Sequence, residues 1–97
     1  MKILALGDVV GTRSIAYLKA NLWNARRIYG ADFVVANGEN ASDIRGISAQ
    51  FAKRLLNAGI DVITLGNHSF NRREILTYLD DNDRILRPAN YAPQTPG

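Results

Sequence analysis

Five polar residues in this chain are of the types that bind divalent metal ions. They lie in three short loops, which contain Asp8, then Glu39 and Asn40, then Asn67 and His68. Divalent metals accept carboxylate oxygens, amide oxygens and imidazole nitrogens as ligands. Each loop directly follows a short apolar run, so the polar residues recur at equivalent points of one pattern. This pattern predicts a metal site if the fold brings the three loops together.

The apolar runs before the loops are predicted to be β-strands of a parallel sheet. They comprise residues 3–6, 33–36 and 62–65. Short apolar segments bounded by glycine are typical of such strands, which are buried on both faces. Right-handed crossovers would make the strands parallel, and their carboxyl ends would then share one edge. Ligands of open α/β sheets bind at this edge, so we expect the five polar residues to converge there.

Helices are predicted in the connections between these strands. In the first connection, apolar residues recur at helical spacing and Gly30 supplies the stop. These apolar residues are Ile15, Leu18, Leu22 and Ala25. The second helix is expected to have Ser48 as its N-cap and to end at Gly59. Its predicted buried residues are Phe51, Leu55 and Leu56.

One further helix and one short strand are predicted after these elements. The helix opens at Asn71, with Glu74 suited to complete a capping box, and buries Ile75 and Leu79. Residues 84–88 are predicted to form a strand whose place in the sheet the sequence leaves open. The prolines at positions 88, 93 and 96 then predict an extended, non-helical end. The order β-α-β-α-β-α-β places the chain in the α/β class.

Length and composition restrict the class of protein further. The 97 residues suffice for one domain at most, and the apolar content of 46% argues against disorder. No apolar stretch approaches the ~20 residues that span a bilayer, so no membrane association is expected. The absence of cysteine excludes thiolate ligands and favours a cytoplasmic location. The net charge of +3 is dispersed, which disfavours duplex nucleic acid as a partner and fits weak attraction of a phosphorylated substrate.

Each polar loop also has a purely structural interpretation. Asp8 could cap the helix that follows it, because aspartate favours helix entry. Asn40 could be a turn residue, and Asn67 with His68 could form a turn that carries a solvated imidazole. Glu39 is harder to explain in this way, because glutamate is not a favoured turn residue. The coincidence of three such loops at three equivalent strand ends favours the metal site.

Four segments of the chain resemble the YmdB branch of the calcineurin-like metallophosphoesterases. They are Gly-Asp-Val-Val-Gly at residues 7–11, Asn-Gly-Glu-Asn-Ala at 37–41, Asp-Val-Ile-Thr-Leu-Gly-Asn-His at 61–68 and Leu-Arg-Pro-Ala-Asn-Tyr at 86–91. The Gly-Asn-His triplet alone is widespread, but the four segments in this order and spacing are specific. The resemblance extends over residues 2–97. It implies that residues 1–97 form the amino-terminal βαβαβα(β) portion of a four-layer α/β/β/α sandwich.

The resemblance also implies a site with two metal ions and a role for each polar residue. Asp8 would bind one ion, Glu39 would bridge both, Asn40 would lie at the metal centre and Asn67 would bind the second ion. His68 would be catalytic, by protonating the leaving oxygen or stabilising the phosphoryl charge. Bridged ions about 3.5–4 Å apart acidify a shared water into a nucleophile. The implied metals are iron and manganese, with zinc or magnesium also suited, and the implied substrates are small phosphate diesters such as cyclic nucleotides.

The chain supplies only part of such a site. Further metal-binding histidines of the family come from a later part of a longer domain, whereas His68 is the single histidine here. Strands that are apolar on both faces also need two covering layers, and three helices can cover one. The uncovered face is expected to include several of Leu4, Leu6, Val34, Ala36, Ile63 and Leu65. We therefore expect an amino-terminal fragment that is inactive alone and that associates with itself, recruits the missing carboxyl-terminal half or fails to fold cooperatively.

Two other functions are compatible with the same residues. The chain could be a non-catalytic half-domain that binds a nucleotide or a partner without hydrolysis. It could also be a flavodoxin-like nucleotide binder. The first loop lacks the glycine-rich phosphate fingerprint, which disfavours the flavodoxin-like alternative.

Overall fold

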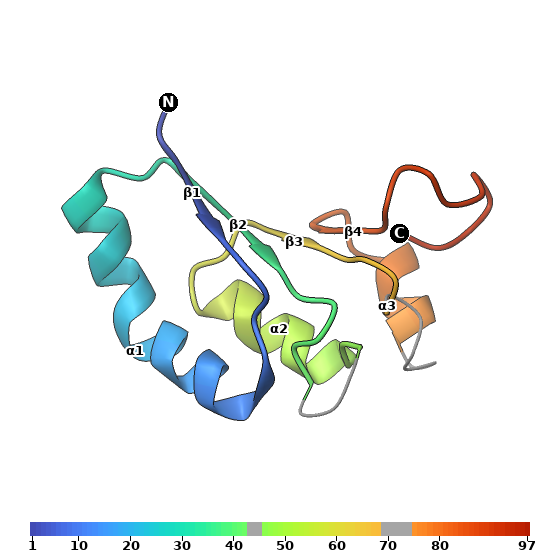
Figure 1. The fold of residues 1–97 in the computed structure, drawn as a ribbon, viewed down its shortest axis with the longest axis horizontal. Helices are drawn as coiled ribbons and strands as arrows, with labels where there is room; N and C mark the ends of the chain where they lie inside the picture. Colours follow the sequence, from blue (N-terminus) through green and yellow to red (C-terminus); the bar gives the residue numbers. More distant parts are fainter. Residues whose placement is uncertain (43–45, 69–74) are drawn as a thin grey trace.

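The computed structural model describes residues 1–42, 46–68 and 75–97 of the chain. Strands and helices alternate along it (Figure 1). In order, the elements are β1 (Ile3–Leu6), α1 (Gly11–Tyr29), β2 (Phe33–Asn37), α2 (Ala49–Asn57), β3 (Val62–Thr64), α3 (Ile75–Asp80) and β4 (Ile85–Leu86). The α/β class predicted from the sequence is confirmed.

The four strands form one parallel sheet in the order β1-β2-β3-β4. In this register Ala36 lies beside Ile63, and Ile63 lies beside Ile85. The short strand whose place the sequence left open is therefore the edge strand next to β3. Because each strand is added on the same side of the one before it, crossovers of one hand place all the helices on one face. Figure 1 shows α1, α2 and α3 together on that face.

The sheet face that packs against the helices, here called the covered face, forms the core. Its central side chains are at most 1% exposed: Val34, Ala36, Ile63 and Ile85. The helices contribute Ile15, Leu22, Leu55, Ile75 and Leu79 to the same cluster. The chain after β2 also passes close to this core, because a Cβ on Gly38 would lie 2.7 Å from Cγ2 of Ile63. The core is thus continuous from the helices to the loop that carries Glu39.

The opposite sheet face, here called the open face, carries a second apolar row that is not the predicted one. Val34, Ala36, Ile63 and Leu65 are buried against the helices, and Leu4 and Leu6 are half-buried. The open face instead presents the alternate residues: Ile3, Ala5, Phe33, Val35, Val62 and Leu86. Ile3 is 60% exposed and Leu86 is 45% exposed. The expectation was wrong because successive strand residues point to opposite faces, and both sets here are apolar.

The predicted signals at the helix ends correspond to observed caps. Gly30 ends α1 in the left-handed conformation, with φ 64°. The Ser48 side chain accepts a 3.1 Å hydrogen bond from the Phe51 amide and caps α2. The helix α2 ends at Asn57 with Ala58 as its C-cap, and Gly59 follows as the predicted stop, with φ +118° and its amide donating to the Leu56 carbonyl at 3.3 Å.

The pattern of burial along the helices follows the predictions in part. Ile15 and Leu22 of α1 are buried, whereas Leu18 and Ala25 are half-buried. In α2, the small residue Ala52 and Leu55 occupy the central buried positions, and the predicted Phe51 and Leu56 are half-buried beside them. In α3, Ile75 and Leu79 are buried as predicted. The predicted helix start at Asn71, with Glu74, lies outside the described residues. Across the described part of the chain, none of the helices has both the length and the hydropathy needed to cross a membrane.

The proline-rich end is non-helical, as predicted, but it is not extended. The Arg87 guanidinium donates hydrogen bonds to the carbonyl oxygens of Pro88, Pro93 and Thr95 at 3.2, 3.3 and 3.2 Å. The Tyr91 amide also donates to the Pro88 carbonyl at 3.1 Å, which closes a turn. A guanidinium has several donors in a fixed plane, so one side chain can hold several turns of backbone together. The end of the chain therefore folds back on Arg87.

Candidate metal centre

The three polar loops lie at the same edge of the sheet. Asp8 follows β1, Glu39 follows β2 and His68 follows β3. Backbone hydrogen bonds between neighbouring segments of the chain continue at or beyond the strand ends. The Val9 amide donates to the Asn37 carbonyl at 3.1 Å, and the Gly38 amide donates to the Thr64 carbonyl at 2.9 Å. The predicted shared edge is therefore observed, and the loops begin from fixed positions.

Glu39 and His68 form the first pair at this edge. The His68 amide donates to Oε2 of Glu39 at 3.1 Å, and the same oxygen lies 3.7 Å from Nδ1 of His68. Both side chains are largely enclosed, with 19% of Glu39 and 26% of His68 exposed. Gly66 makes room for this pair, because a Cβ at that position would overlap both carboxylate oxygens of Glu39. The imidazole Nδ1 edge thus faces Glu39, and Nε2 lies on a different edge of the ring.

Asp8 and Asn40 form the second pair. Nδ2 of Asn40 donates to Oδ1 of Asp8 at 3.3 Å. The amide oxygen of Asn40 is buried and has no hydrogen-bond partner among the described residues. Asp8 does not cap the following helix, because the N-cap of α1 is Val10, two residues later. The structural interpretation of Asp8 as a helix cap is therefore wrong, and its carboxylate is directed to Asn40 instead.

The structure groups four of the five predicted residues into two pairs, and the fifth, Asn67, stands apart from both pairs. The peptide bond between Glu39 and Asn40 joins the two pairs. Asn67 is exposed, and it lies between Gly66 and His68 in the third loop. Within the described ranges, no three side chains of the types His, Cys, Asp and Glu lie close enough to hold a metal ion. Any metal bound here by the described residues alone would need the amide oxygens as ligands.

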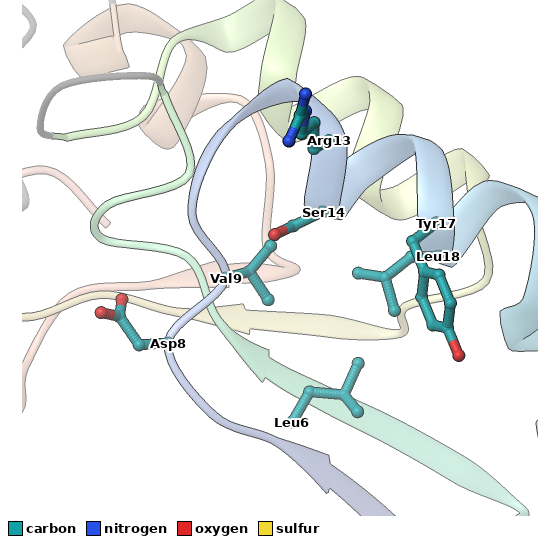
Figure 2. A pocket seen from close by; sticks show the side chains of 7 residues that line it. All are labelled: Leu6, Asp8, Val9, Arg13, Ser14, Tyr17 and Leu18. Atoms are coloured by element: carbon teal, nitrogen blue, oxygen red, sulfur yellow. The ribbon is translucent and has the colours of Figure 1, made fainter.

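A shallow hollow lies beside β1 and should be distinguished from this site (Figure 2). Its lining residues are Leu6, Asp8, Val9, Arg13, Ser14, Tyr17 and Leu18. Figure 2 shows the Asp8 carboxylate pointing away from the side chains of Leu18 and Tyr17. The Asp8 carboxylate is therefore directed to Asn40. The other residues that line the hollow belong to β1, to α1 and to the loop between them.

The donor set fits a divalent metal ion. A buried polar atom is nearly always paired, so the unpartnered amide oxygen of Asn40 needs a partner that the described residues do not supply. A cation is such a partner, and the adjacent carboxylate of Asp8 is a second oxygen donor for it. Glu39, one residue away, offers a further carboxylate. Oxygen and imidazole donors of this kind suit manganese, iron, zinc and magnesium and do not discriminate strongly among them.

Tyr91 is a component of this edge to which the sequence analysis assigned no role. Its hydroxyl donates a 2.7 Å hydrogen bond to the Gly66 carbonyl, directly before Asn67. The only signal in the sequence was its place at the end of the segment at residues 86–91. The sequence marks Gly66 only as a turn residue. Its close approach to the Glu39 carboxylate is a tertiary contact, which the sequence pattern does not reveal.

Comparison with known proteins places these features in a family context. The family model described as YmdB-like protein matches residues 4–97. The 2',3'-cyclic-nucleotide 2'-phosphodiesterase of Bacillus subtilis (strain 168) is 37% identical over 97 residues, which is 100% of this chain and 37% of that protein. A putative phosphatase/phosphodiesterase of Mycoplasma pneumoniae is 33% identical over 90 residues, which is 93% of this chain and 32% of that protein.

Two crystal structures share the fold. A hypothetical protein from Thermus thermophilus matches 100% of this chain and 37% of its own, with a TM-score of 0.88 and 36% identity. A novel phosphatase from Mycoplasma pneumoniae matches 91% of this chain and 31% of its own, with a TM-score of 0.84 and 33% identity. The chain therefore spans about a third of the length of the relatives that it matches, and it corresponds to an amino-terminal α/β portion.

Proposed function

Because the chain belongs to the YmdB-like protein family, we propose that it is the amino-terminal part of a metal-dependent phosphodiesterase. The observation that carries this proposal is the buried amide oxygen of Asn40, which has no partner among the described residues, while the nitrogen of the same amide group donates to the Asp8 carboxylate. It lies at the sheet edge where Glu39 and His68 also meet. A purely structural turn would leave no reason to bury that oxygen without a partner.

Each of the polar residues at this edge would have its own role in binding metal or substrate. Asp8 and Asn40 would hold one metal ion, Asn67 would hold a second, and Glu39 would bridge the two. When bound, such ions supply an acidified water as nucleophile and stabilise the charge on the phosphoryl oxygens. Glu39 also fixes the backbone of His68 through the 3.1 Å hydrogen bond from its amide. Since Nδ1 of His68 faces Glu39, Nε2 is the atom that would donate a proton to the leaving oxygen or stabilise the phosphoryl charge.

The proposed substrates are small phosphate diesters, in particular cyclic nucleotides. The family resemblance and the named activity of the Bacillus subtilis relative both support this class. The amide ligands support it as well, because they provide oxygen donors without adding negative charge that would repel a phosphate. We propose iron, manganese or a mixed pair as the metals, with zinc or magnesium as further options, and a cytoplasmic location consistent with the lack of cysteine.

The open face of the sheet would be covered in the working enzyme. Ile3 and Leu86 on this face are 60% and 45% exposed, and contiguous apolar surface of this kind drives association. We propose that the remaining part of a four-layer domain covers it, or that a second copy of the chain does. The first arrangement would also bring the additional histidines that the site requires, since this segment contributes one.

The test compares metal content and hydrolysis in the full-length protein that carries this segment. Elemental analysis should give two metal ions per chain, and bis-p-nitrophenyl phosphate should be hydrolysed. Glu39→Gln should reduce the metal content to one ion or none, because the bridging carboxylate is weakened. His68→Ala should lower turnover ~10²–10⁴-fold with nearly unchanged metal content, as for loss of a positioned acid. Full occupancy of both sites in Glu39→Gln would reject the bridging role, and activity within twofold of the parent in His68→Ala would reject the catalytic role.

A non-catalytic half-domain is the second candidate. The observation that favours it is that no three His, Cys, Asp or Glu side chains of the described residues converge on one point. Such a half-domain would bind a nucleotide or a protein partner without hydrolysing a phosphodiester. Binding of a cyclic nucleotide to the full-length protein with no metal-dependent turnover would support this candidate over the enzyme.

A further inference from the structure

The loop of Gly66, Asn67 and His68 is held at both ends by side chains from other parts of the chain. The Gly66 carbonyl accepts a 2.7 Å hydrogen bond from the Tyr91 hydroxyl. The His68 amide donates a 3.1 Å hydrogen bond to Glu39. Asn67 lies between these two contacts.

These two hydrogen bonds act on the two peptide planes that flank Asn67. The Gly66 carbonyl belongs to the plane before the Asn67 Cα, and the His68 amide belongs to the plane after it. Peptide planes are rigid, so holding both of them restrains the two backbone dihedral angles of Asn67. The direction in which the Asn67 side chain leaves the backbone is then restrained as well.

This restraint matters because the loop begins with a glycine that the site requires. Any larger residue at position 66 would overlap the Glu39 carboxylate. Glycine, however, has more backbone freedom than any other residue, so the position that makes room for Glu39 also loosens the loop. The Tyr91 hydroxyl restricts the motion that this glycine would otherwise allow.

Tyr91 is itself well anchored. It is half-buried, and its amide closes a turn with the Pro88 carbonyl at 3.1 Å. The guanidinium of Arg87 holds the carbonyls of Pro88, Pro93 and Thr95 around it. The hydroxyl is therefore presented from a folded segment, which makes it an effective restraint on the loop.

We propose that Tyr91 is a positioning residue of the metal centre, which holds the Gly66–Asn67 peptide so that Asn67 is presented to the second metal ion. This inference rests on the proposed function. Tyr91 does not contact the reacting atoms in this role and acts through Asn67. Loss of the Tyr91 hydroxyl should therefore weaken the binding of one metal ion more than the binding of the other.

The test uses Tyr91→Phe in the full-length protein, which removes only the hydroxyl. Tyr78→Phe is the matched control, because the Tyr78 hydroxyl also makes one hydrogen bond, from Nδ2 of Asn82 at 3.2 Å, but within the α3 region. Titration of the metal-free protein with Mn²⁺ measures the two dissociation constants. Tyr91→Phe should raise the dissociation constant of one of the two ions ~10-fold or more, as is common for residues that orient ligands, and that of the other less than twofold. Turnover should fall with little change in KM.

A second measurement does not depend on metal. In the metal-free protein, hydrogen exchange of the His68 amide should be about tenfold faster in Tyr91→Phe, because the hydrogen bond from Tyr91 to the Gly66 carbonyl is then lost from the loop. Tyr78→Phe should leave both dissociation constants and this exchange rate within twofold of the parent. Unchanged values in Tyr91→Phe, or equal changes in the two variants, would overturn the positioning role while the parent still bound two ions. A parent that binds no metal would reject the proposed function itself, and the role of Tyr91 with it.

Discussion

Val34 and Val35 are adjacent residues of the same type in β2, yet their environments differ. Val34 points to the covered face and is fully buried, whereas Val35 points to the open face and is half-buried. Successive residues of a strand alternate between faces, so residue type alone cannot decide which of the two is covered. The difference is set by where the helices lie. It shows that this segment contains one completed apolar interface and one that still needs a covering layer.

The same contrast holds across the sheet. Ile63 and Ile85 on the covered face are fully buried, and Ile3 on the open face is 60% exposed. Strands that are apolar on both sides are typical of sheets with helices or a second sheet on each face. The open face therefore has the composition of an interior and the exposure of a surface.

Lysine substitutions at Val34 and Val35 should differ most in their effect on the folding of the segment. Val34→Lys should abolish cooperative folding of the 97-residue segment, because burial of an unpaired ammonium costs several kcal/mol against a total stability of about 5–15 kcal/mol. Val35→Lys should keep the helical signal and reduce self-association through the open face. Far-UV circular dichroism and sedimentation velocity measure the two effects. Equal unfolding by both substitutions, or unchanged association in Val35→Lys, would contradict the distinction between the faces.

The contrast between packed and open positions extends to the glycines at the strand ends. A Cβ on Gly66 would overlap the Glu39 carboxylate, whereas a Cβ on Gly7 would have no atom within 4 Å. Gly66→Ala should therefore cost about 1–3 kcal/mol of unfolding free energy in the full-length protein and lower its metal content. Gly7→Ala, as the matched control, should change the stability by less than about 0.5 kcal/mol. Urea unfolding together with elemental analysis checks both, and normal metal content in Gly66→Ala would show that Glu39 can move without loss of the site.

The smallest change in stability is expected for a substitution in α2, one of the helices that pack on the covered face. Ser48→Ala removes the hydroxyl that accepts a hydrogen bond from the Phe51 amide. Loss of such a cap lowers the free energy of unfolding by about 1 kcal/mol. Ser48→Asp should recover most of this loss, because aspartate is an equally good cap. The unfolding midpoint in urea reports both variants. If Ser48→Ala has the stability of the parent, then α2 is held by its packing on the sheet and its cap is unimportant.

Local signals in the sequence were reliable predictors of this fold. Ser48 and Gly30 mark helix ends through contacts within a few residues, and apolar runs between glycines mark the strands. The choice of covered face was not predictable in this way, because Val34 and Val35 belong to equally apolar sets. The closeness of Gly59 to Trp23 of α1, where a Cβ would lie 3.1 Å from Cε2 of the indole, was likewise not predictable from local signals.

The candidate site was predictable to a similar extent. Parallel topology placed Asp8, Glu39 and His68 at one edge, because strand ends in such a sheet must share it. The pairing of Asp8 with Asn40 depends on side-chain conformations, which the sequence pattern does not specify. The contact of Tyr91 with Gly66 joins residues 25 positions apart through a folded tail, and no local rule describes such a contact.

The strand order β1-β2-β3-β4 has a consequence for how the chain is made. Every strand after the first pairs with its immediate predecessor, so each one finds its partner already synthesised when it leaves the ribosome. At ~5–20 residues per second, translation of this segment takes roughly 5–20 s. The sheet can therefore grow one strand at a time. During that interval its apolar open face would remain exposed to association with other apolar surfaces.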